Sequence, residues 1–195
     1  MRKIIFWISD SAALIISQIA MAAQVKIGFV TPLTGGAGAI GNDMRDAVEL
    51  ALDHLGGKMG GSDVKMFYED DTFKPDVGKQ KTEKLVKKDK VHFVTGYIWS
   101  HVLLASRNSV VGKGPFMITS NAGPGPVAGK LCHEDFLPTS WQNDQTTMAK
   151  GEVLNKLGIK NHYIMAPNYA SGKCMVAALP RTLKGNIRGK DKTKD

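Results

Sequence analysis

Apolar and polar residues along this chain alternate between short, β-branched runs and longer segments with helical spacing. The runs expected to form strands or extended links are 25–30, 64–68, 91–95, 116–119, 135–139 and 163–166. The segments expected to form helices are 42–55, 75–88, 100–111, 146–157 and 172–183. Short apolar runs are typical of strands covered on both faces. Strands that alternate with helices predict an α/β fold with a doubly wound parallel sheet and right-handed crossovers.

The clearest unit is the strand, loop and helix between residues 25 and 55. Asn42 or Asp43 can N-cap the helix, and the glycines at 56–57 end it. Ligands of open parallel sheets bind outside the carboxyl ends of the strands. The loop 31–41 and the loops after later strands are therefore the places where a binding site is expected.

The first loop also contains a G-x-G-x-x-G pattern at residues 36–41, which is the fingerprint of dinucleotide binding. In that fingerprint the first glycine follows the strand directly, whereas five residues separate Val30 from Gly36 here. The acidic residue expected about 20 positions further on would fall near Gly60 and Gly61. An NAD-dependent oxidoreductase therefore stays only as the alternative function, and we expect no cofactor.

Residues 1–22 have the layout of a secretory signal peptide. Arg2 and Lys3 precede an apolar stretch, and residues 20–22 (Ala-Met-Ala) match a small-residue cleavage site. Asp10 interrupts the apolar stretch, so a buried helix is the alternative interpretation. No other run approaches the ~18 apolar residues that span a bilayer. We therefore expect a protein exported to the periplasm, with a cleavable leader.

The formal net charge of +8 raises the question of a nucleic-acid partner. Residues 1–22 hold two bases and one acid, and residues 181–195 hold six bases and two acids. The body between them has eighteen bases and fifteen acids, which is a net charge of only +3. Its lysines gather on the helix expected at 75–88, without the aromatic residues that nucleic-acid grooves use. We expect a solvated helix face there and no nucleic-acid binding.

The sequence offers little catalytic or metal chemistry. It has no G-x-S-x-G, H-E-x-x-H or P-loop motif, and its five histidines are scattered without metal-ligand spacing. We therefore expect neither an enzyme nor a metal site. Cys132 and Cys174 could form a disulfide in an oxidising compartment, but their spacing does not show that their Cα atoms come within ~7 Å.

Two loops carry donors that suit a small anion. Ser100 stands where the helix 100–111 begins, so its hydroxyl and the free N–H groups of the first turn can bind a carboxylate. Asn121, Ala122 and Gly123 follow the next strand and would place further backbone donors beside the same crevice. Each feature also has a plain structural explanation, in which Ser100 is a simple N-cap and the residues after the strand form a turn.

Five blocks of the sequence carry a family resemblance: KIGFVTPLTGGAGAIG, VTGYIWS, MITSNAGPGPVAG, FLPTSWQNDQ and YIMAPNYASGK. They resemble the corresponding segments of type I periplasmic solute-binding proteins of ABC importers. They are most similar to the leucine/isoleucine/valine-binding family, particularly its branch for amino-acid-like and aromatic carboxylates. The resemblance runs from about Val25 to Gly185. It implies a monomeric, two-lobed receptor that closes on a small carboxylate or amino acid and delivers it to a permease in the inner membrane.

The resemblance also implies a set of ligand-binding residues. They are Ile40, Ile98, Trp99, Ser100, Asn121, Ala122, Gly123 and Tyr169. Ser100 takes the place of the family's ligand serine, and Tyr169 that of its second-lobe aromatic residue. Gly123 stands where amino-acid binders have a hydroxyl-bearing residue, so the backbone must donate there. Trp99 and Tyr169 would suit stacking on an aromatic ring, although a tryptophan packed in the core is the alternative.

The implied domain organisation has four parts. They are a signal peptide at 1–22, a first lobe at 23–140, a link and incomplete second lobe at 141–185, and a disordered basic tail at 186–195. Receptors of this kind are much longer, so we expect a truncated fragment with impaired binding, since lobe closure strengthens polar contacts by excluding water. A ligand-free lobe that acts only through partner contacts is a further hypothesis.

Overall fold

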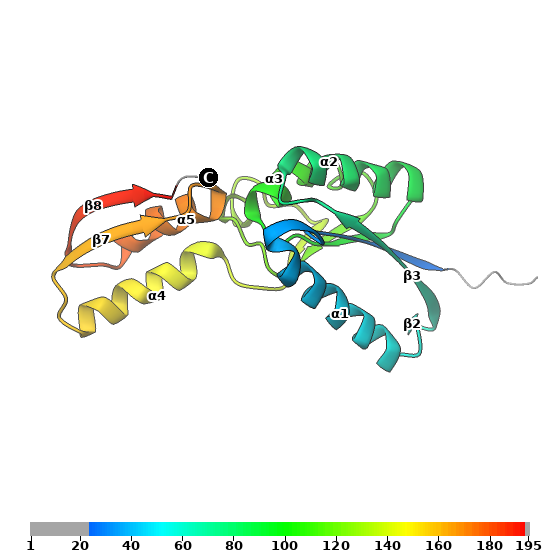
Figure 1. Ribbon diagram of the computed structural model, residues 1–195, viewed down its shortest axis with the longest axis horizontal. Helices are drawn as coiled ribbons and strands as arrows, with labels where there is room; N and C mark the ends of the chain where they lie inside the picture. The colour runs from blue at the N-terminus through cyan, green and yellow to red at the C-terminus, as the bar shows by residue number, and fades with distance from the viewer. Residues whose placement is uncertain (1–23, 194–195) are drawn as a thin grey trace, which may run out of the picture.

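The computed structural model describes residues 24–193 of the chain. These residues form two α/β bodies that lie side by side along the longest axis of the molecule (Figure 1). The signal peptide predicted at residues 1–22 lies outside the described residues. Among residues 24–193, no helix combines the length and the apolar character that a membrane span requires.

The larger body is built on a six-stranded sheet with the strand order β2-β3-β1-β4-β5-β6. The strands are β1 (Val25–Thr31), β2 (Lys58–Met59), β3 (Ser62–Asp70), β4 (Phe93–Gly96), β5 (Phe116–Thr119) and β6 (Phe136–Pro138). All neighbouring strands pair in parallel except the short β2, which is antiparallel to β3. The predicted parallel, doubly wound sheet is confirmed.

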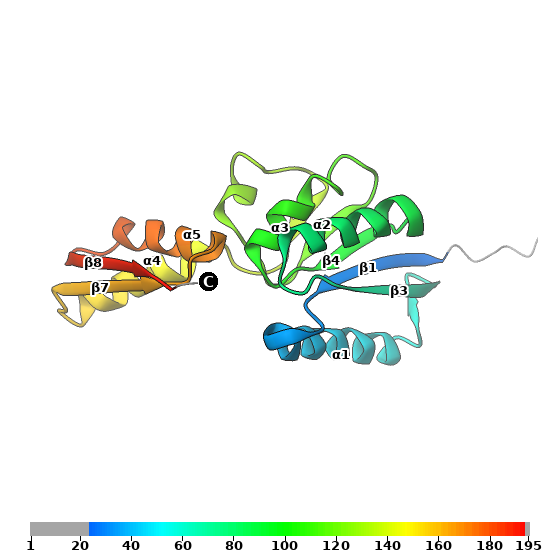
Figure 2. The same ribbon diagram turned by 45° about the horizontal axis from the view of Figure 1, so that its top comes forward.

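Helices lie on both faces of this sheet (Figure 2). They are α1 (Gly38–His54), α2 (Pro75–Lys84) with a π-helical turn at Leu85–Asp89, α3 (Ser100–Arg107), and short 3-10 turns at Gly35–Ala37 and Gly125–Ala128. α2 and α3 cover one face, while α1 lies on the other (Figure 2). α2 approaches α3 closely at Gly78, where an added Cβ would lie only 2.4 Å from Cγ1 of Val102.

The face under α2 and α3 holds the main hydrophobic core. Its buried residues are Val30, Leu85, Val91, Val94, Tyr97, Val102, Leu103, Val110, Met117, Ala122, Val127 and Phe136. Alternate residues of a strand point to opposite faces of the sheet, which places Val30, Val94 and Met117 on this side. The core therefore lies behind the carboxyl ends of β1 and β4 and gives the site described below a rigid support.

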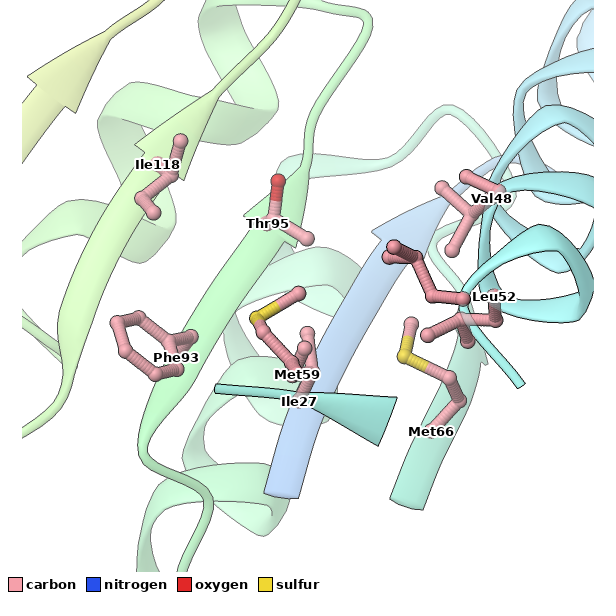
Figure 3. A pocket seen from close by; sticks show the side chains of 10 residues that line it. Ile27, Val48, Leu52, Met59, Met66, Phe93, Thr95 and Ile118 are labelled. Atoms are coloured by element: carbon pink, nitrogen blue, oxygen red, sulfur yellow. The ribbon is translucent and has the colours of Figure 1, made fainter. Parts of the chain in front are cut away.

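The opposite face is only partly covered. α1 packs Val48 and Leu52 over Ile27 and Met66, which leaves an apolar groove of about 300 Å³ that extends to Phe93 (Figure 3). Further along the same face, Phe116 is 42% exposed and Leu137 is 48% exposed. We call Phe93, Phe116, Ile118 and Leu137 the open face. Parallel sheets in α/β proteins are normally covered on both sides, so this surface is unusual.

The smaller body contains two strands and two helices. Its elements are α4 (Asn143–Lys156), β7 (Asn161–Ala166), α5 (Ala170–Ala178) with a 3-10 turn at Leu179–Arg181, and β8 (Asn186–Lys192). β7 and β8 pair in parallel. Ile164 and Ala166 are buried, whereas Tyr163 and Met165 on the other face of β7 are largely exposed. The smaller body thus also has an apolar surface that its own elements do not cover.

The structure differs from the expectation of a disordered tail at 186–195, because residues 186–192 form β8. A strand needs suitable side chains only at every second position, and here Ile187 and Gly189 are half-buried while Arg188 between them and Lys190 after them are exposed. Arg188 Nε also donates to Asn161 Oδ1 of β7 at 2.8 Å. The run of charges in the sequence hid this alternation.

The start of α1 differs from the expectation, and the open question of a disulfide can be addressed. α1 begins at Gly38, before the predicted N-caps Asn42 and Asp43. Asn42 instead lies within the helix, where its Nδ2 donates to Leu33 O at 3.1 Å and Gly38 O at 2.8 Å. The structure does not contain a disulfide, because the exposed Cys132 and the half-buried Cys174 are both free thiols. They belong to different bodies, which the sequence could not show.

We predict that Leu137→Lys lowers self-association and the binding of a hydrophobic dye, because it places a charge on the open face at a sheet edge. The free energy of unfolding should change by less than about 0.5 kcal/mol, since Leu137 is half-exposed. The matched control is Leu50→Lys, which charges an exposed residue of α1 outside the groove. A wild-type chain that is monomeric at high concentration and binds no dye would contradict this prediction.

Candidate functional site

A cleft of about 870 Å³ lies where the two bodies meet. It is lined by Phe73, Trp99, His101, Pro167, Asn168, Tyr169, Ala170, Lys173 and Thr193. The first three residues follow the carboxyl ends of β3 and β4, and the rest belong to the smaller body, around the end of β7, the start of α5 and the end of β8. The cleft therefore has the position at strand ends that an open parallel sheet favours for ligands.

Four rings form an aromatic cluster across this cleft. The ring centroids of Phe73 and Trp99 are 4.7 Å apart, and those of Phe73 and His101 are 4.9 Å apart. Tyr169, from the smaller body, lies 5.8 Å from Trp99 and 5.3 Å from His101. All four contacts are edge-to-face, an arrangement that aromatic pairs prefer. The aromatic cluster thus joins the two bodies around a hollow with apolar walls.

Trp99 reaches the cleft through a tight turn after β4. Gly96 has a φ of 100°, and a Cβ there would lie 2.3 Å from Val30 O, so only glycine suits this position. The next residue, Tyr97, donates its N–H to Val30 O at 2.7 Å. Its buried hydroxyl lies 2.6 Å from Thr82 Oγ1. These contacts fix the start of α3, and Trp99 directly precedes that helix.

Tyr169 is placed by the loop between β7 and α5 in the smaller body. It directly precedes α5, and its carbonyl accepts the N–H of Lys173 at 3.1 Å. A Cβ on Gly172 would lie 2.0 Å from Pro167 O, so the loop after β7 packs tightly on the first turn of α5. Lys173 is exposed and is the one lysine or arginine among the residues that line the cleft. A carboxylate in the cleft would find a cation there.

Ser100 is buried behind the cleft and is only 2% exposed. Its Oγ accepts a hydrogen bond from Asn143 Nδ2 at 2.9 Å. Asn143 is the first residue of α4, and its own N–H donates to Gly123 O at 2.8 Å. A Cβ on Gly123 would lie 2.0 Å from Trp141 O. Ser100 and Gly123 therefore hold the start of the smaller body against the larger one.

The other predicted positions are also accounted for. Ile98 and Ala122 are buried, and the Ala122 N–H donates to Tyr97 O at 3.1 Å. Asn121 is half-buried, and Ile40 is an exposed residue of α1 that does not line the cleft. Of the eight predicted residues, Trp99 and Tyr169 line the cleft. The ligand-binding roles of all eight stay predictions.

Sequence reasoning missed Phe73, His101, Asn168 and Lys173 as cleft residues. Phe73 follows the acidic end of β3 and has a left-handed φ of 66°, which is rare for an aromatic residue and not readable from composition. His101 lies next to Ser100 in the sequence, but its ring nitrogen Nε2 lies 3.3 Å from Phe73 O rather than near the serine hydroxyl. Asn168 directly precedes Tyr169, and Lys173 follows it by four residues. The prediction of Tyr169 as a ligand-binding residue was therefore the signal that could have found both.

Acidic side chains at the end of β3 brace the larger body. Glu69 is buried and paired with Lys81 at 2.9 Å and with Lys84. Burial acts to raise the pKa of Glu69, but the hydrogen bonds from the two lysines outweigh it, so the pKa lies below its usual range. Asp70 accepts the Leu33 N–H at 2.9 Å. Glu69 thus ties β3 to α2, and Asp70 ties it to the loop after β1.

The dinucleotide-like pattern at 36–41 forms a 3-10 turn and the start of α1. A Cβ on Gly41 would lie 1.8 Å from Pro32 O, whereas one on Gly36 would have nothing within 4 Å. Gly41 is therefore explained by close packing of the helix on the loop. Among residues 24–193, no group of His, Cys, Asp or Glu side chains is arranged to hold a metal ion.

The two α/β bodies, with a cleft at the strand ends, give this chain a bilobed architecture. Residues 24–194 match the family model described as periplasmic binding protein, and the chain belongs to that family. It is 29% identical over 164 residues to the Leu/Ile/Val-binding protein BraC3 of Rhizobium johnstonii, covering 83% of this chain and 44% of that protein. It is 28% identical over 156 residues to Leu/Ile/Val-binding protein homolog 2 of Brucella abortus, covering 79% and 38%.

Solved structures show the same fold. A solute-binding protein of an ABC transporter from R. palustris, in complex with benzoate, superposes with a TM-score of 0.83 at 26% identity, over 87% of this chain and 48% of that one. The substrate-binding protein LivJ of Streptococcus pneumoniae, in complex with isoleucine, gives a TM-score of 0.77 at 21% identity, over 87% and 49%. The chain spans about half the length of these two solved structures. It spans less than half the length of the two curated relatives.

Replacing Gly41 by alanine should destabilise the protein by about 1–3 kcal/mol, because the new methyl group overpacks against Pro32 O. The matched control, Gly36→Ala, should change the free energy of unfolding by less than about 0.5 kcal/mol. Chemical denaturation of both variants measures this difference. Equal effects of the two substitutions would show that the packing of Gly41 is not the reason for the glycine.

Ser100→Ala should cost about 1–3 kcal/mol, because it leaves the buried Asn143 amide without its acceptor. A double-mutant cycle with Asn143→Ala should give a coupling energy of about 0.5–1.5 kcal/mol. Additive effects of the two substitutions would contradict a stabilising hydrogen bond between the bodies.

Proposed function

We propose that this chain is the substrate-binding component of an ABC importer and takes a small aromatic or amino-acid carboxylate into the cleft between its two bodies. The observation that carries the proposal is the aromatic cluster, because it supplies ring faces and edges from both bodies around one hollow. The family membership supports a binding role without catalysis.

Aromatic carboxylates suit the lining best. A planar ring can pack against Phe73, Trp99 and Tyr169 with the geometry that aromatic pairs prefer. The ammonium group of Lys173 would pair with the carboxylate. A relative in complex with benzoate and another in complex with 3,4-dihydroxy benzoic acid support this ligand class.

Export and delivery complete the proposal. Residues 1–22 would serve as a cleavable signal peptide, so that the mature chain works in the periplasm. It would then present its ligand to an inner-membrane permease, as expected of a transporter's binding component. Because the smaller body has a two-stranded sheet among the described residues, we propose that this chain binds more weakly than the longer relatives it matches.

The test is thermal stabilisation by benzoate, 4-hydroxybenzoate, leucine and isoleucine, since a ligand that binds the folded state raises the melting temperature. Trp99→Leu should abolish stabilisation by benzoate. The control Trp141→Phe should retain it, because Trp141 is exposed and lies outside the cleft.

A second comparison tests the role of charge. Wild type should prefer benzoate to benzamide, and Lys173→Gln should remove that preference, whereas the exposed Lys150→Gln of α4 should keep it. No stabilisation by any carboxylate, or stabilisation that Trp99→Leu leaves intact, would overturn the proposed function.

A further inference from the structure

A buried carboxyl group lies directly behind the wall of the cleft. Asp71 follows β3 and is fully buried. Its N–H donates to Thr31 O of β1 at 3.2 Å, and its carbonyl accepts the Lys74 N–H at 2.8 Å. Its Oδ1 accepts the N–H of Phe73 at 2.8 Å. Asp71 therefore links the end of β1 to the start of α2 through the loop that carries a cleft residue.

That loop has an unusual backbone. Thr72 and Phe73 are consecutive non-glycine residues in the left-handed region, with φ values of 48° and 66°. A residue with a Cβ disfavours this conformation, so neighbouring groups must hold it. Asp70 Oδ1 accepts the Thr72 N–H at 2.8 Å, and Asp71 Oδ1 accepts the Phe73 N–H. Two successive carboxyl groups thus hold two successive N–H groups of the loop.

The loop conformation decides where the Phe73 ring lies. The ring contacts Trp99 and His101 in the aromatic cluster, and Phe73 O lies 3.3 Å from His101 Nε2. Release of the loop would separate Phe73 from both rings and widen the cleft at its β3 side. The hydrogen bond from Phe73 to Asp71 therefore helps to hold a cleft-lining ring in its place.

The surroundings of Asp71 disfavour a negative charge. A Cβ on Gly78 of α2 would lie 3.4 Å from the Cβ of Asp71, and Asp71 Oδ2 is buried without a hydrogen-bond partner among the described residues. Burial raises the pKa of Asp71 to about 6, the Phe73 N–H opposes this, and the neighbouring Asp70 carboxylate adds to it. Burial also raises the pKa of Tyr97, whose hydroxyl is bonded to Thr82, so it stays neutral.

We propose that Asp71 is a positioning residue whose proton state controls the Thr72–Phe73 loop and, through it, the aromatic cluster. When Asp71 is protonated, the loop stays closed and Phe73 remains in the cluster. When Asp71 is ionised, the unpaired buried charge favours loop states in which water reaches the carboxylate. The proposal rests on the proposed function only where it concerns ligand affinity.

Proton linkage sets the direction in which the stability of the closed loop changes with pH. The pKa of Asp71 is raised above its ordinary 3.8, so the stability that its protonated form gives the closed loop is complete below pH 3.8 and declines as the pH rises toward about 6. If the carboxyl regains its ordinary pKa when the loop opens, opening is about tenfold more favourable at pH 7 than at pH 5.

Amide hydrogen exchange of the full chain tests this without a ligand. Corrected for intrinsic exchange, the protection factor of the Phe73 amide should fall about tenfold between pH 5 and pH 7. The Leu33 amide is the internal control, because Asp70 accepts it. Hydrogen bonds from Thr34 and nearby backbone groups outweigh burial and hold the pKa of Asp70 below its usual range. Protection of Leu33 should not change.

Two variants identify the titrating group. Asp71→Asn keeps an oxygen acceptor for Phe73 but cannot ionise, so it should remove the pH dependence. His101→Gln should retain the dependence, although His101 also contacts Phe73. A constant protection factor in wild type, or equal pH dependence in Asp71→Asn, would overturn the proposal.

Direct titration keeps the test valid if Asp71→Asn does not fold. The ¹³C resonance of the wild-type Asp71 carboxyl should titrate near pH 6, and a midpoint at or below 4 would overturn the proposal. Benzoate affinity, measured on the same samples, should fall as the pH rises from 5 to 7. A pH-dependent loop in a chain that binds no benzoate would overturn the proposed function and support the role of Asp71.

Discussion

The position of the cleft depends on one close backbone approach, between Gly96 at the end of β4 and Val30 in β1. The left-handed turn at Gly96 and the hydrogen bond from Tyr97 to Val30 O redirect the chain into α3 at the carboxyl edge of the sheet. Trp99 stands at this bend. Any side chain at position 96 would collide with Val30, so the glycine is a condition for the site as well as for the fold.

The two bodies are held together by a small number of specific contacts around that bend. The aromatic cluster joins them through Trp99 and Tyr169, and the buried hydrogen bond between Ser100 and Asn143 joins them behind it. Both sheets also carry apolar side chains that the described elements do not cover, such as Leu137 and Met165. The molecule therefore combines a well-packed cleft wall with incompletely covered outer faces.

The sequence predicted the alternation of strands and helices and the parallel sheet, because apolar periodicity depends on local residue order. The family resemblance identified Trp99 and Tyr169, which line the cleft. It did not locate Phe73, whose position comes from backbone hydrogen bonds to Asp70 and Asp71 that no periodicity encodes. β8 was missed for a different reason, since charges at its exposed positions outnumber the residues that pack.

The burial of Ser100 shows how a tertiary contact changes the meaning of a local motif. A serine at a helix start suits a carboxylate, but here its Oγ accepts the Asn143 amide from 43 residues further along the chain. The structure therefore shifts the emphasis of the site from helix-end donors to aromatic side chains with Lys173 beside them.

We propose that a small aromatic acid binds between the two bodies. A set of nuclear Overhauser contacts between the ring protons of benzoate and the protein tests this directly. We expect contacts to both Trp99 and Tyr169, one from each body. Contacts confined to Ile27 and Leu52, in the apolar groove beneath α1, would contradict it.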